Sequence, residues 1–261
     1  MQKLFDAHFH IIDSAYPLAG NNGFTPEWYT VDDYLEELKG TGLELVGGAV
    51  VSGSFQAYDQ SYFEGALGRL GAGYVGVTQL DPAVSDDDIR RLDALGIRAI
   101  RFNLYRGLSA TPEEIEVLAR RVFDLASWKT ELYLDAAKVT DELDALILRL
   151  PAVSIDHLGM SRLEDPSSLI RYVSHDVPIR VTGFGRIGYS REEARNLISK
   201  LYVENPRALL FGTDLPATRA RYRFSMDDVA LVKDAVGERN AQDILWKNGL
   251  RWYLGVNSKS F

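Results

Sequence analysis

The sequence predicts a single (β/α)8 barrel. Eight apolar stretches rich in β-branched residues each precede a helical stretch, and this strict alternation calls for parallel strands. Eight such units within 261 residues, with no break in composition, fit a barrel. A doubly wound open sheet is the alternative, but it would usually carry a glycine-rich phosphate loop after the first strand. Here the first strand ends in histidines instead, so we expect one barrel over residues 1–256, followed by a frayed tail at 257–261.

Local signals place each element. Strands such as residues 43–51 are continuous apolar runs, typical of strands buried on both faces. The helix at 111–127 begins with a capping threonine, a proline and two acids. A polar, turn-rich segment at 13–30 is long for a connection, so we expect it to act as a lid. The strands are predicted at 3–10, 43–51, 73–80, 97–103, 131–136, 153–158, 179–183 and 209–213, and the helices at 31–39, 56–70, 85–95, 111–127, 140–150, 167–175, 190–202, 225–236 and 241–253.

Composition narrows the classes of function. Hydrophobic residues make up 46% of the chain and charged residues 25%, and the formal net charge is −8. An acidic surface disfavours nucleic acid as a partner. The absence of cysteine excludes disulfides and thiolate metal sites. No apolar run is long enough to span a membrane, and the chain begins directly with a strand, so we expect a cytoplasmic protein that can form a homo-oligomer.

Chemically active side chains collect at the predicted strand ends. Alternation along the first strand places Asp6, His8 and His10 on one face. His157 ends the sixth strand and Asp214 the eighth, so three of the four histidines meet at one end of the barrel. Such a group suits metal ligation or polarisation of a carbonyl. The structural alternatives are core histidines satisfied by hydrogen bonds and an aspartate that only caps the next segment.

The fourth and fifth strands add polar groups to the same end. Arg101 and Asn103 follow two apolar inward positions, and Tyr133 shares a face with Asp135. A buried guanidinium needs an acidic partner. We predict that the partner of Arg101 is a substrate carboxylate, whereas a fixed pair with Asp135 would make Arg101 structural.

Arginines in later loops are weaker candidates. Arg106 and Arg186 are as compatible with structural pairing as with substrate binding. Arg219, Arg221 and Arg223 have the pattern of a solvated face.

Four motifs carry a resemblance to a known family. These are Asp-Ala-His-Phe-His at 6–10, Arg-Phe-Asn at 101–103, Asp-His-Leu-Gly at 156–159, and Asn-Pro-Arg followed by Leu-Phe-Gly-Thr-Asp within 205–214. Together they resemble the amidohydrolase superfamily, and within it the branch of amidohydrolase-related lactonases that includes 2-pyrone-4,6-dicarboxylate lactonase. The stretch at 245–250 is similar to the closing helix of that branch.

The resemblance implies a barrel with hydrolytic chemistry in which His8, His10, His157 and Asp214 are catalytic. It also implies that Arg101 holds a substrate carboxylate, with Arg186 as a second such group. Metal-dependent members usually have a histidine where this chain has Tyr133 and Asp135, and dinuclear members often have a lysine at the place of Arg101. We therefore expect no required cofactor. The alternative is one divalent metal such as zinc, on His8, His10 and Asp214.

These observations predict a hydrolase that opens a carboxylated lactone. Asp214 would activate water as a general base, and the three histidines would stabilise the oxyanion. The predicted substrate-binding residues are Arg101, Arg106, Arg186, Tyr133 and Asn103. Two alternatives remain open: a metal-dependent amide hydrolase or decarboxylase on the same scaffold, and a catalytically silent barrel that binds a small anion.

Overall fold

The computed structural model describes residues 1–19, 23–106 and 110–256. The expected frayed tail at 257–261 lies outside the described residues, as does the part of the expected lid at 20–22. None of the helices in the described ranges has the length and apolar character needed to cross a membrane.

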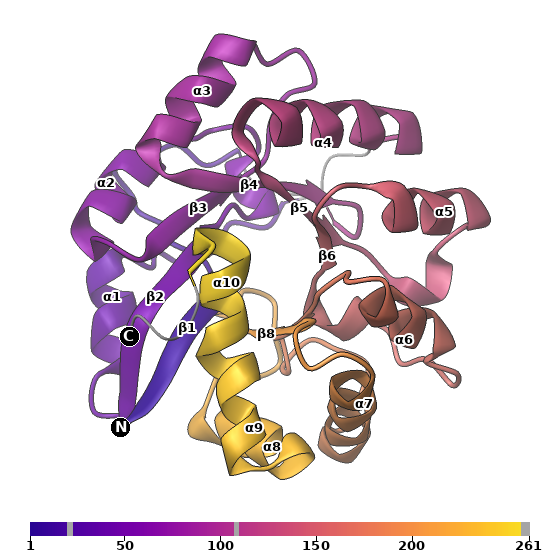
Figure 1. The fold of residues 1–261 in the computed structure, drawn as a ribbon. Helices are drawn as coiled ribbons and strands as arrows, with labels where there is room; N and C mark the ends of the chain where they lie inside the picture. The colour runs from indigo at the N-terminus through magenta and orange to yellow at the C-terminus, as the bar shows by residue number, and fades with distance from the viewer. Residues whose placement is uncertain (20–22, 107–109, 257–261) are drawn as a thin grey trace.

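Eight parallel strands form one sheet whose spatial order follows the chain, and helices surround it (Figure 1). The predicted (β/α)8 barrel is confirmed. The strands are β1 (Gln2–Phe9), β2 (Leu43–Val51), β3 (Tyr74–Thr78), β4 (Ile97–Asn103), β5 (Lys129–Tyr133), β6 (Val153–Ile155), β7 (Ile179–Val181) and β8 (Leu209–Phe211).

Most helices begin where a side-chain cap is available. Thr111, for example, accepts a hydrogen bond from the Glu114 backbone while the Glu114 side chain returns to the Thr111 backbone. The helices are α1 (Val31–Leu38), α2 (Tyr62–Leu70), α3 (Asp86–Leu95), α4 (Pro112–Ala126), α5 (Asp141–Arg149), α6 (Ser167–Ser174), α7 (Arg191–Glu204), α8 (Met226–Val236), α9 (Glu238–Gln242) and α10 (Asn248–Leu254). Short helical turns are η1 (Ser54–Gln56), η2 (Ala136–Lys138), η3 (His157–Gly159) and η4 (Asp243–Lys247).

Two predicted helices and two predicted strands differ clearly from the observed ones. The helix expected at 56–70 begins only at Tyr62, after η1, and the helix expected at 241–253 is interrupted by the π-helical turn η4. Strands β6 and β8 end before His157 and Asp214, whose φ angles of 52° and 60° are left-handed. Both side chains are therefore aimed by turns in an unusual backbone conformation, a feature that clusters at functional sites.

Backbone hydrogen bonds connect the end of β1 to the segment after β8. The Asp214 amide donates to the His8 carbonyl (2.8 Å), and the His10 amide donates to the Leu215 carbonyl (2.7 Å). These bonds draw the two ends of the sheet together and fix the first-strand histidines beside Asp214.

Asp6 corrects one expectation. The pairing of β1 with β2 shifts register between Asp6 and Phe9, which interrupts the simple alternation. The Asp6 carboxylate accepts hydrogen bonds from Tyr34 of α1 (3.1 Å) and from the Thr213 hydroxyl (2.6 Å) and amide (2.8 Å). Burial raises its pKa to about 6. Asp6 therefore ties β1 to α1 and to the end of β8 instead of joining the histidines.

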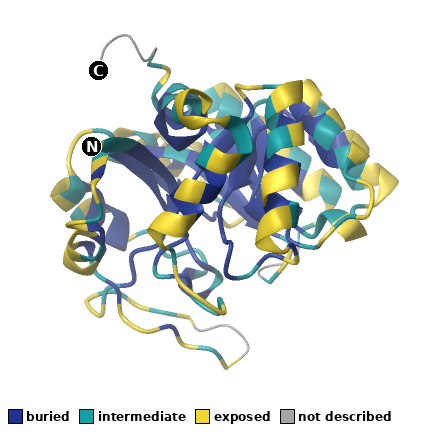
Figure 2. Cartoon of the chain, turned by 90° about the horizontal axis from the view of Figure 1, so that it is seen from below, coloured by how far each residue is buried: buried dark blue, intermediate teal, exposed yellow. Residues whose placement is uncertain are grey.

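The strands are buried and the helices are exposed along their outer turns (Figure 2). Within the barrel, the side chain of Arg180 is fully buried and contacts Ser154, Glu131, Asp156 and the Tyr253 hydroxyl. Its guanidinium lies 2.6 Å from the Ser154 hydroxyl and 3.4 Å from Asp156 Oδ1. A charged network thus occupies the barrel core where an apolar layer would be usual.

Candidate active site

His8, His10, His157 and Asp214 meet inside the barrel at the C-terminal ends of the strands. His8 Nε2 and His10 Nε2 lie 3.8 Å and 3.6 Å from Asp214 Oδ1. The His8 ring centroid is 5.1 Å from that of His10 and 4.8 Å from that of His157. The structure therefore brings together the four residues that the sequence singled out, from β1 and the ends of β6 and β8.

Most of their polar atoms lack hydrogen bonds. Among the described residues, neither ring nitrogen of His8 or His157 has a hydrogen-bond partner, and neither carboxylate oxygen of Asp214 has one. Asp214 has an ion pair with Arg186, whose Nη2 lies 2.8 Å from Oδ2. Leaving buried polar atoms unsatisfied costs free energy of about 1–3 kcal/mol each. This concentration of open donors and acceptors marks a site built for a ligand.

Burial and neighbouring cations set the protonation states. Burial lowers the pKa of His157 to about 3, and burial together with the field of His157 and Arg101 lowers that of His8 well below its usual value. Burial alone would raise the pKa of Asp214, but Arg186 and His157 more than offset it and hold that pKa at about 2. At neutral pH the site therefore contains an ionised carboxylate beside two neutral imidazoles.

A hydrogen bond fixes the tautomer of His10. Its Nδ1 lies 2.7 Å from the Val51 carbonyl oxygen, which can only accept. Nδ1 must therefore carry a proton, and Nε2 is the nitrogen that faces Asp214.

The donor set is compatible with a metal ion. One ligand atom from each of His8, His157 and Asp214 can be chosen so that all lie within 4.8 Å of one another. The metal ligands suggested by the sequence were His8, His10 and Asp214, so in this group His157 replaces His10. His8, Glu131 and Asp156 form a second group of the same size. That second group surrounds the Arg180 guanidinium and does not suit a further cation.

Arg101 has a permanent acidic partner, so the prediction that its partner arrives with the substrate is wrong. Its guanidinium contacts Asp156 Oδ2 through Nε (2.9 Å) and Nη2 (2.8 Å), and Nη1 donates to the Ser52 carbonyl. The rival partner considered, Asp135, instead caps η2 and lies 3.6 Å from Lys138 Nζ. The true partner is Asp156, the residue immediately before His157. Strand β6 ends at Ile155, and the turn that follows directs the Asp156 side chain into the barrel.

Tyr133 and Asn103 support the site from β5 and β4. The Tyr133 ring contacts His157 at a centroid distance of 4.9 Å, and the Arg101 guanidinium lies 4.8 Å from its centroid. The Asn103 side-chain oxygen accepts from the Arg106 amide (3.0 Å), which anchors the loop that carries Arg106.

Arg106, Arg186 and Arg219 gather at the mouth of the barrel. Arg186 is almost completely buried and donates to the Thr218 carbonyl as well as facing Asp214. Burial, followed by repulsion from Arg106 and Arg186, lowers the pKa of Arg219. The repulsion that Arg219 feels from the other two guanidinium groups favours an anionic ligand here.

The expectation of a solvated arginine face after β8 agrees with the exposure of these residues, since Arg221 and Arg223 are exposed and Arg219 is half-buried. Arg219 belongs to the mouth of the barrel. Arg221 donates to the carbonyls of Gly185 and Ile187, and Arg223 pairs with Glu37 at 2.6 Å. Spacing in a loop contains no periodic signal, so the sequence could not separate these three roles.

The buried charges Glu131, Asp156 and Arg180 were also missed. Each is a charged residue within an apolar strand or directly after one. This break in the apolar pattern is the sequence signal that could have identified them. Burial raises the pKa of Glu131 to about 7 against the opposing field of Arg180, whereas Arg101 and Arg180 overcome burial and lower that of Asp156.

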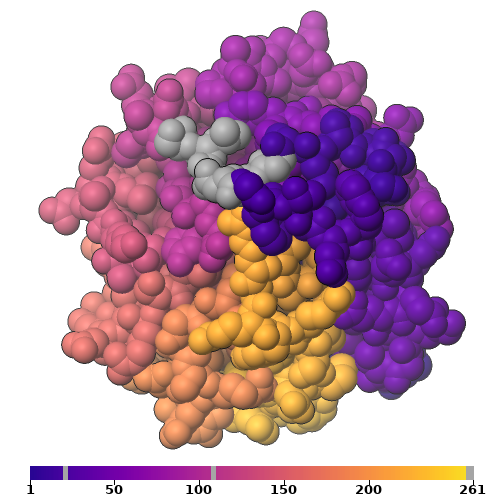
Figure 3. All heavy atoms as spheres, turned by 180° about the vertical axis from the view of Figure 1, so that it is seen from behind, coloured from indigo at the N-terminus to yellow at the C-terminus, as the bar shows by residue number. Residues whose placement is uncertain are grey.

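The catalytic candidates are covered: the exposed fractions of His8, His10, His157 and Asp214 are 0%, 3%, 0% and 1%. These four side chains are therefore closed off from solvent in this conformation. Residues 24–29 and the loop after β8 enclose a cavity of about 420 Å³ at the mouth. The segment before α1 that contains residues 24–29 and the loop after β8 lie side by side at the barrel mouth (Figure 3).

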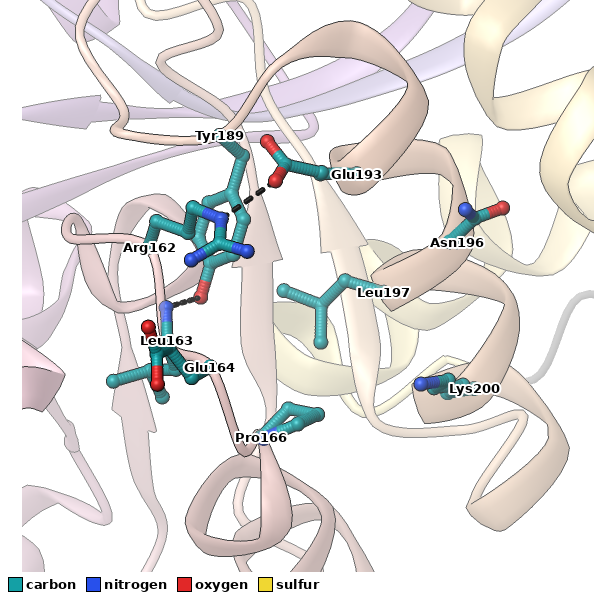
Figure 4. Close-up of a pocket in the computed structure, with 9 residues that line it drawn as sticks. All are labelled: Arg162, Leu163, Glu164, Pro166, Tyr189, Glu193, Asn196, Leu197 and Lys200. Atoms are coloured by element: carbon teal, nitrogen blue, oxygen red, sulfur yellow. Dashed lines mark hydrogen bonds and ion pairs between the residues drawn. The ribbon is translucent and has the colours of Figure 1, made fainter.

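A separate cavity of about 190 Å³ lies between the segment after β6 and α7 (Figure 4). Its walls include an ion pair between Arg162 and Glu193 and a hydrogen bond from the Leu163 amide to the Tyr189 hydroxyl. None of the four catalytic candidates lines it. The four candidates line neither this cavity nor the one between residues 24–29 and the loop after β8, so their own position at the C-terminal strand ends defines the candidate active site.

An eight-stranded parallel barrel with histidines and an acid at the C-terminal strand ends has the arrangement of a barrel enzyme. The model of the amidohydrolase family matches residues 5–254. The chain belongs to this family.

The relatives agree with this assignment. A 2-pyrone-4,6-dicarboxylate hydrolase of Comamonas testosteroni is 22% identical, over 81% of this chain and 76% of that protein. The crystal structure of a probable 2-pyrone-4,6-dicarboxylic acid hydrolase from Acinetobacter baumannii, with citric acid bound, superposes with a TM-score of 0.79 at 20% identity, covering 96% of this chain and 98% of that one. A putative hydrolase of the same acid from Pseudomonas putida gives 0.78 at 21% identity, covering 96% and 97%.

Proposed function

We propose that this protein hydrolyses a lactone, or a related cyclic ester, that carries carboxylate groups. The observation that carries the proposal is the ionised, incompletely satisfied Asp214 beside the neutral rings of His8 and His157. The curated relative named as a 2-pyrone-4,6-dicarboxylate hydrolase points to the same substrate class.

Asp214 is the general base in this proposal. Its Oδ2 contacts Arg186, whereas Oδ1 faces the Nε2 atoms of His8 and His10 and is the oxygen available to a water molecule. Its pKa of about 2 keeps it ionised throughout the working range, as a general base must be. Water deprotonated here would attack the ester carbonyl, and the ring would open as the carbon–oxygen bond of the tetrahedral adduct breaks.

The histidines supply hydrogen-bond donors for the oxyanion. A neutral imidazole has one N–H, and neither nitrogen of His8 or His157 is bound to another group among the described residues. Donors that are already in place when charge develops stabilise the transition state more than the ground state. Removing one such donor typically lowers kcat by about a hundredfold or more.

Arginines at the mouth recognise the carboxylates of the substrate. Arg106 and Arg186 remain in the proposed binding group, together with Tyr133 and Asn103. Arg186 Nη2 already contacts Asp214 and the Thr218 carbonyl, but its Nε has no hydrogen-bond partner among the described residues. Arg101 leaves this group because Asp156 and the Ser52 carbonyl already bind its guanidinium. Its role is to hold Asp156 beneath His8, whose Nδ1 lies 3.7 Å from Asp156 Oδ1.

A divalent metal could be held by His8, His157 and Asp214, where it would polarise the carbonyl as a Lewis acid. We propose that the hydrolysis does not require one. Arg186 already supplies positive charge at Asp214, and β5 offers Tyr133 where a further histidine ligand would be expected.

A hydrolysis screen of carboxylated lactones, enol-lactones and their neutral esters, run with and without a chelator, tests the proposal. We expect turnover of the carboxylated compounds, with most of the activity left after thorough chelation. Activity that disappears on chelation and returns with zinc would favour the metal-dependent alternative. If no lactone is turned over in either condition, the proposed function is wrong.

A further inference from the structure

The cavity between residues 24–29 and the loop after β8 is a candidate ligand site in its own right. Its volume of about 420 Å³ is in the range of small-molecule pockets. The described residues that line it combine aromatic rings with charged groups: Phe24, Thr25, Glu27, Trp28, Tyr29, Pro216, Ala217, Thr218, Arg219 and Arg223.

We propose that this cavity is a substrate-specificity subsite that takes a planar, anionic substituent, with Arg219 facing its carboxylate and Phe24 and Trp28 packing against its ring. The inference rests on the proposed function, because the substituent would belong to the ester whose carbonyl Asp214 and the histidines attack.

The charged side chains at the cavity favour an anionic ligand. The guanidinium carbon of Arg219 lies 4.0 Å from the centroid of the Phe24 ring, so the ring orients the cation at the cavity wall. The second cation of the lining, Arg223, is paired with Glu37 and lies over Tyr29. Glu27 is the one carboxylate in the lining and is exposed to solvent. The proximity of Arg106 and Arg186 to Arg219 adds further positive potential from the side of the catalytic centre.

Shape and composition select a flat group. Three aromatic side chains of the segment 24–29 line the cavity, and Trp28 remains 53% exposed. An exposed indole beside an arginine is a surface that a planar anion can cover, because ring stacking and charge pairing act together.

One arginine lies between the cavity and the catalytic centre and contacts both, although none of the four catalytic candidates lines the cavity. Arg186 donates to the carbonyl of Thr218, which lines the cavity, and the same guanidinium contacts Asp214. Asp214, Ala217 and Arg219 all have left-handed φ angles, of 60°, 61° and 62°. A short loop held in this conformation connects the proposed base to the proposed subsite.

Direct binding tests the subsite without turnover. Benzoate is the planar anionic probe, benzamide its neutral counterpart and acetate an anion without a ring, each titrated against the tryptophan fluorescence of the full chain. Trp28 is the exposed reporter, since Trp128 and Trp246 are 0% and 7% exposed. We expect benzoate to quench saturably, at least tenfold more tightly than benzamide or acetate, with the signal lost in Trp28→Phe.

Two variants and a matched control locate the probe. We expect Arg219→Gln to weaken benzoate binding about tenfold or more and Phe24→Leu to weaken it several-fold. Arg239→Gln, which removes an equal charge from an exposed position on α9, should change nothing. The proposal is overturned if benzoate and benzamide bind with the same affinity. It is also overturned if quenching by benzoate persists in Trp28→Phe, or if Phe24→Leu binds benzoate as tightly as the parent. Because no hydrolysis is measured, each of these results is independent of the outcome of the lactone screen.

Discussion

Two charged regions inside the same barrel differ in how completely their polar atoms are satisfied. In the core, one guanidinium of Arg180 contacts Glu131, Asp156, Ser154 and Tyr253, and of the charged groups in this network only Glu131 Oε2 lacks a hydrogen-bond partner among the described residues. At the mouth, His8 and His157 have no hydrogen bonds to the described residues, although they are just as deeply buried.

The difference separates scaffold from active site. A buried charge that contacts opposite charges and hydrogen-bond partners is part of the folded framework. Buried groups left unsatisfied cost stability, and proteins retain them where a ligand or a reaction uses them. We therefore expect substitutions in the core to change mainly stability and substitutions at the mouth to change mainly the reaction.

Asp214→Asn should have the largest effect on catalysis. An amide cannot accept the proton from water, so we expect kcat to fall about a thousandfold, within the range for loss of a general base. Asp135→Asn is the matched control at the rim, since that carboxylate caps η2, and it should retain activity. If Asp214→Asn hydrolyses lactones at a normal rate, Asp214 is not the base.

Arg180→Met should have the largest effect on folding. It leaves Glu131 and Asp156 buried with too little positive charge, so we expect the free energy of unfolding to fall by about 3–5 kcal/mol in urea titrations. Adding Glu131→Leu to this variant should restore part of the loss, because removing both partners costs less than removing one. If Arg180→Met alone is as stable as the parent, the assignment of this network to the scaffold is contradicted.

Arg101→Met tests the boundary between the two regions. Asp156 loses one cation but keeps Arg180, so we expect a smaller loss of about 2–3 kcal/mol. The variant should still prefer carboxylated over neutral lactones, whereas Arg106→Met should weaken that preference. Loss of the preference in Arg101→Met, with normal folding, would return Arg101 to the substrate-binding group.

The pH dependence of stability gives the smallest and most specific effect. The folded pKa of His157, about 3, lies below its ordinary value of 6.5. Between these values the unfolded chain binds a proton that the folded chain does not, so stability falls as the pH decreases from 6.5 toward 3. Each such histidine lowers the free energy of unfolding by up to about 1.4 kcal/mol per pH unit over this range.

Asp6 and Glu131, whose pKa values are raised to about 6 and about 7, act in the opposite direction. Their folded forms take up protons first, which favours the folded state as the pH falls from 7 toward 4. We therefore expect the contribution of His157 to appear in the difference between the parent and His157→Gln, measured by urea unfolding between pH 7 and pH 4.5. Parallel stability curves for the two proteins would mean that His157 is not held neutral.

The barrel and the position of most candidate site residues could be predicted from the sequence. Alternating apolar and capped helical segments are local signals, and a (β/α)8 barrel converts the order of strands in the chain directly into their order in space. The strand ends carrying His8, His10, His157 and Asp214 could therefore be assigned to one face of the molecule before any coordinates were known.

The pairing of charges depends on the tertiary structure. Arg101 contacts Asp156, which directly follows a strand two positions away, and Arg219 packs against Phe24 from a loop without periodicity. Pairing of this kind depends on side-chain reach and on the exact end of each strand, as the early ends of β6 and β8 show. Local sequence patterns encode the path of the backbone, whereas the partners of long side chains follow from contacts between segments distant in the chain.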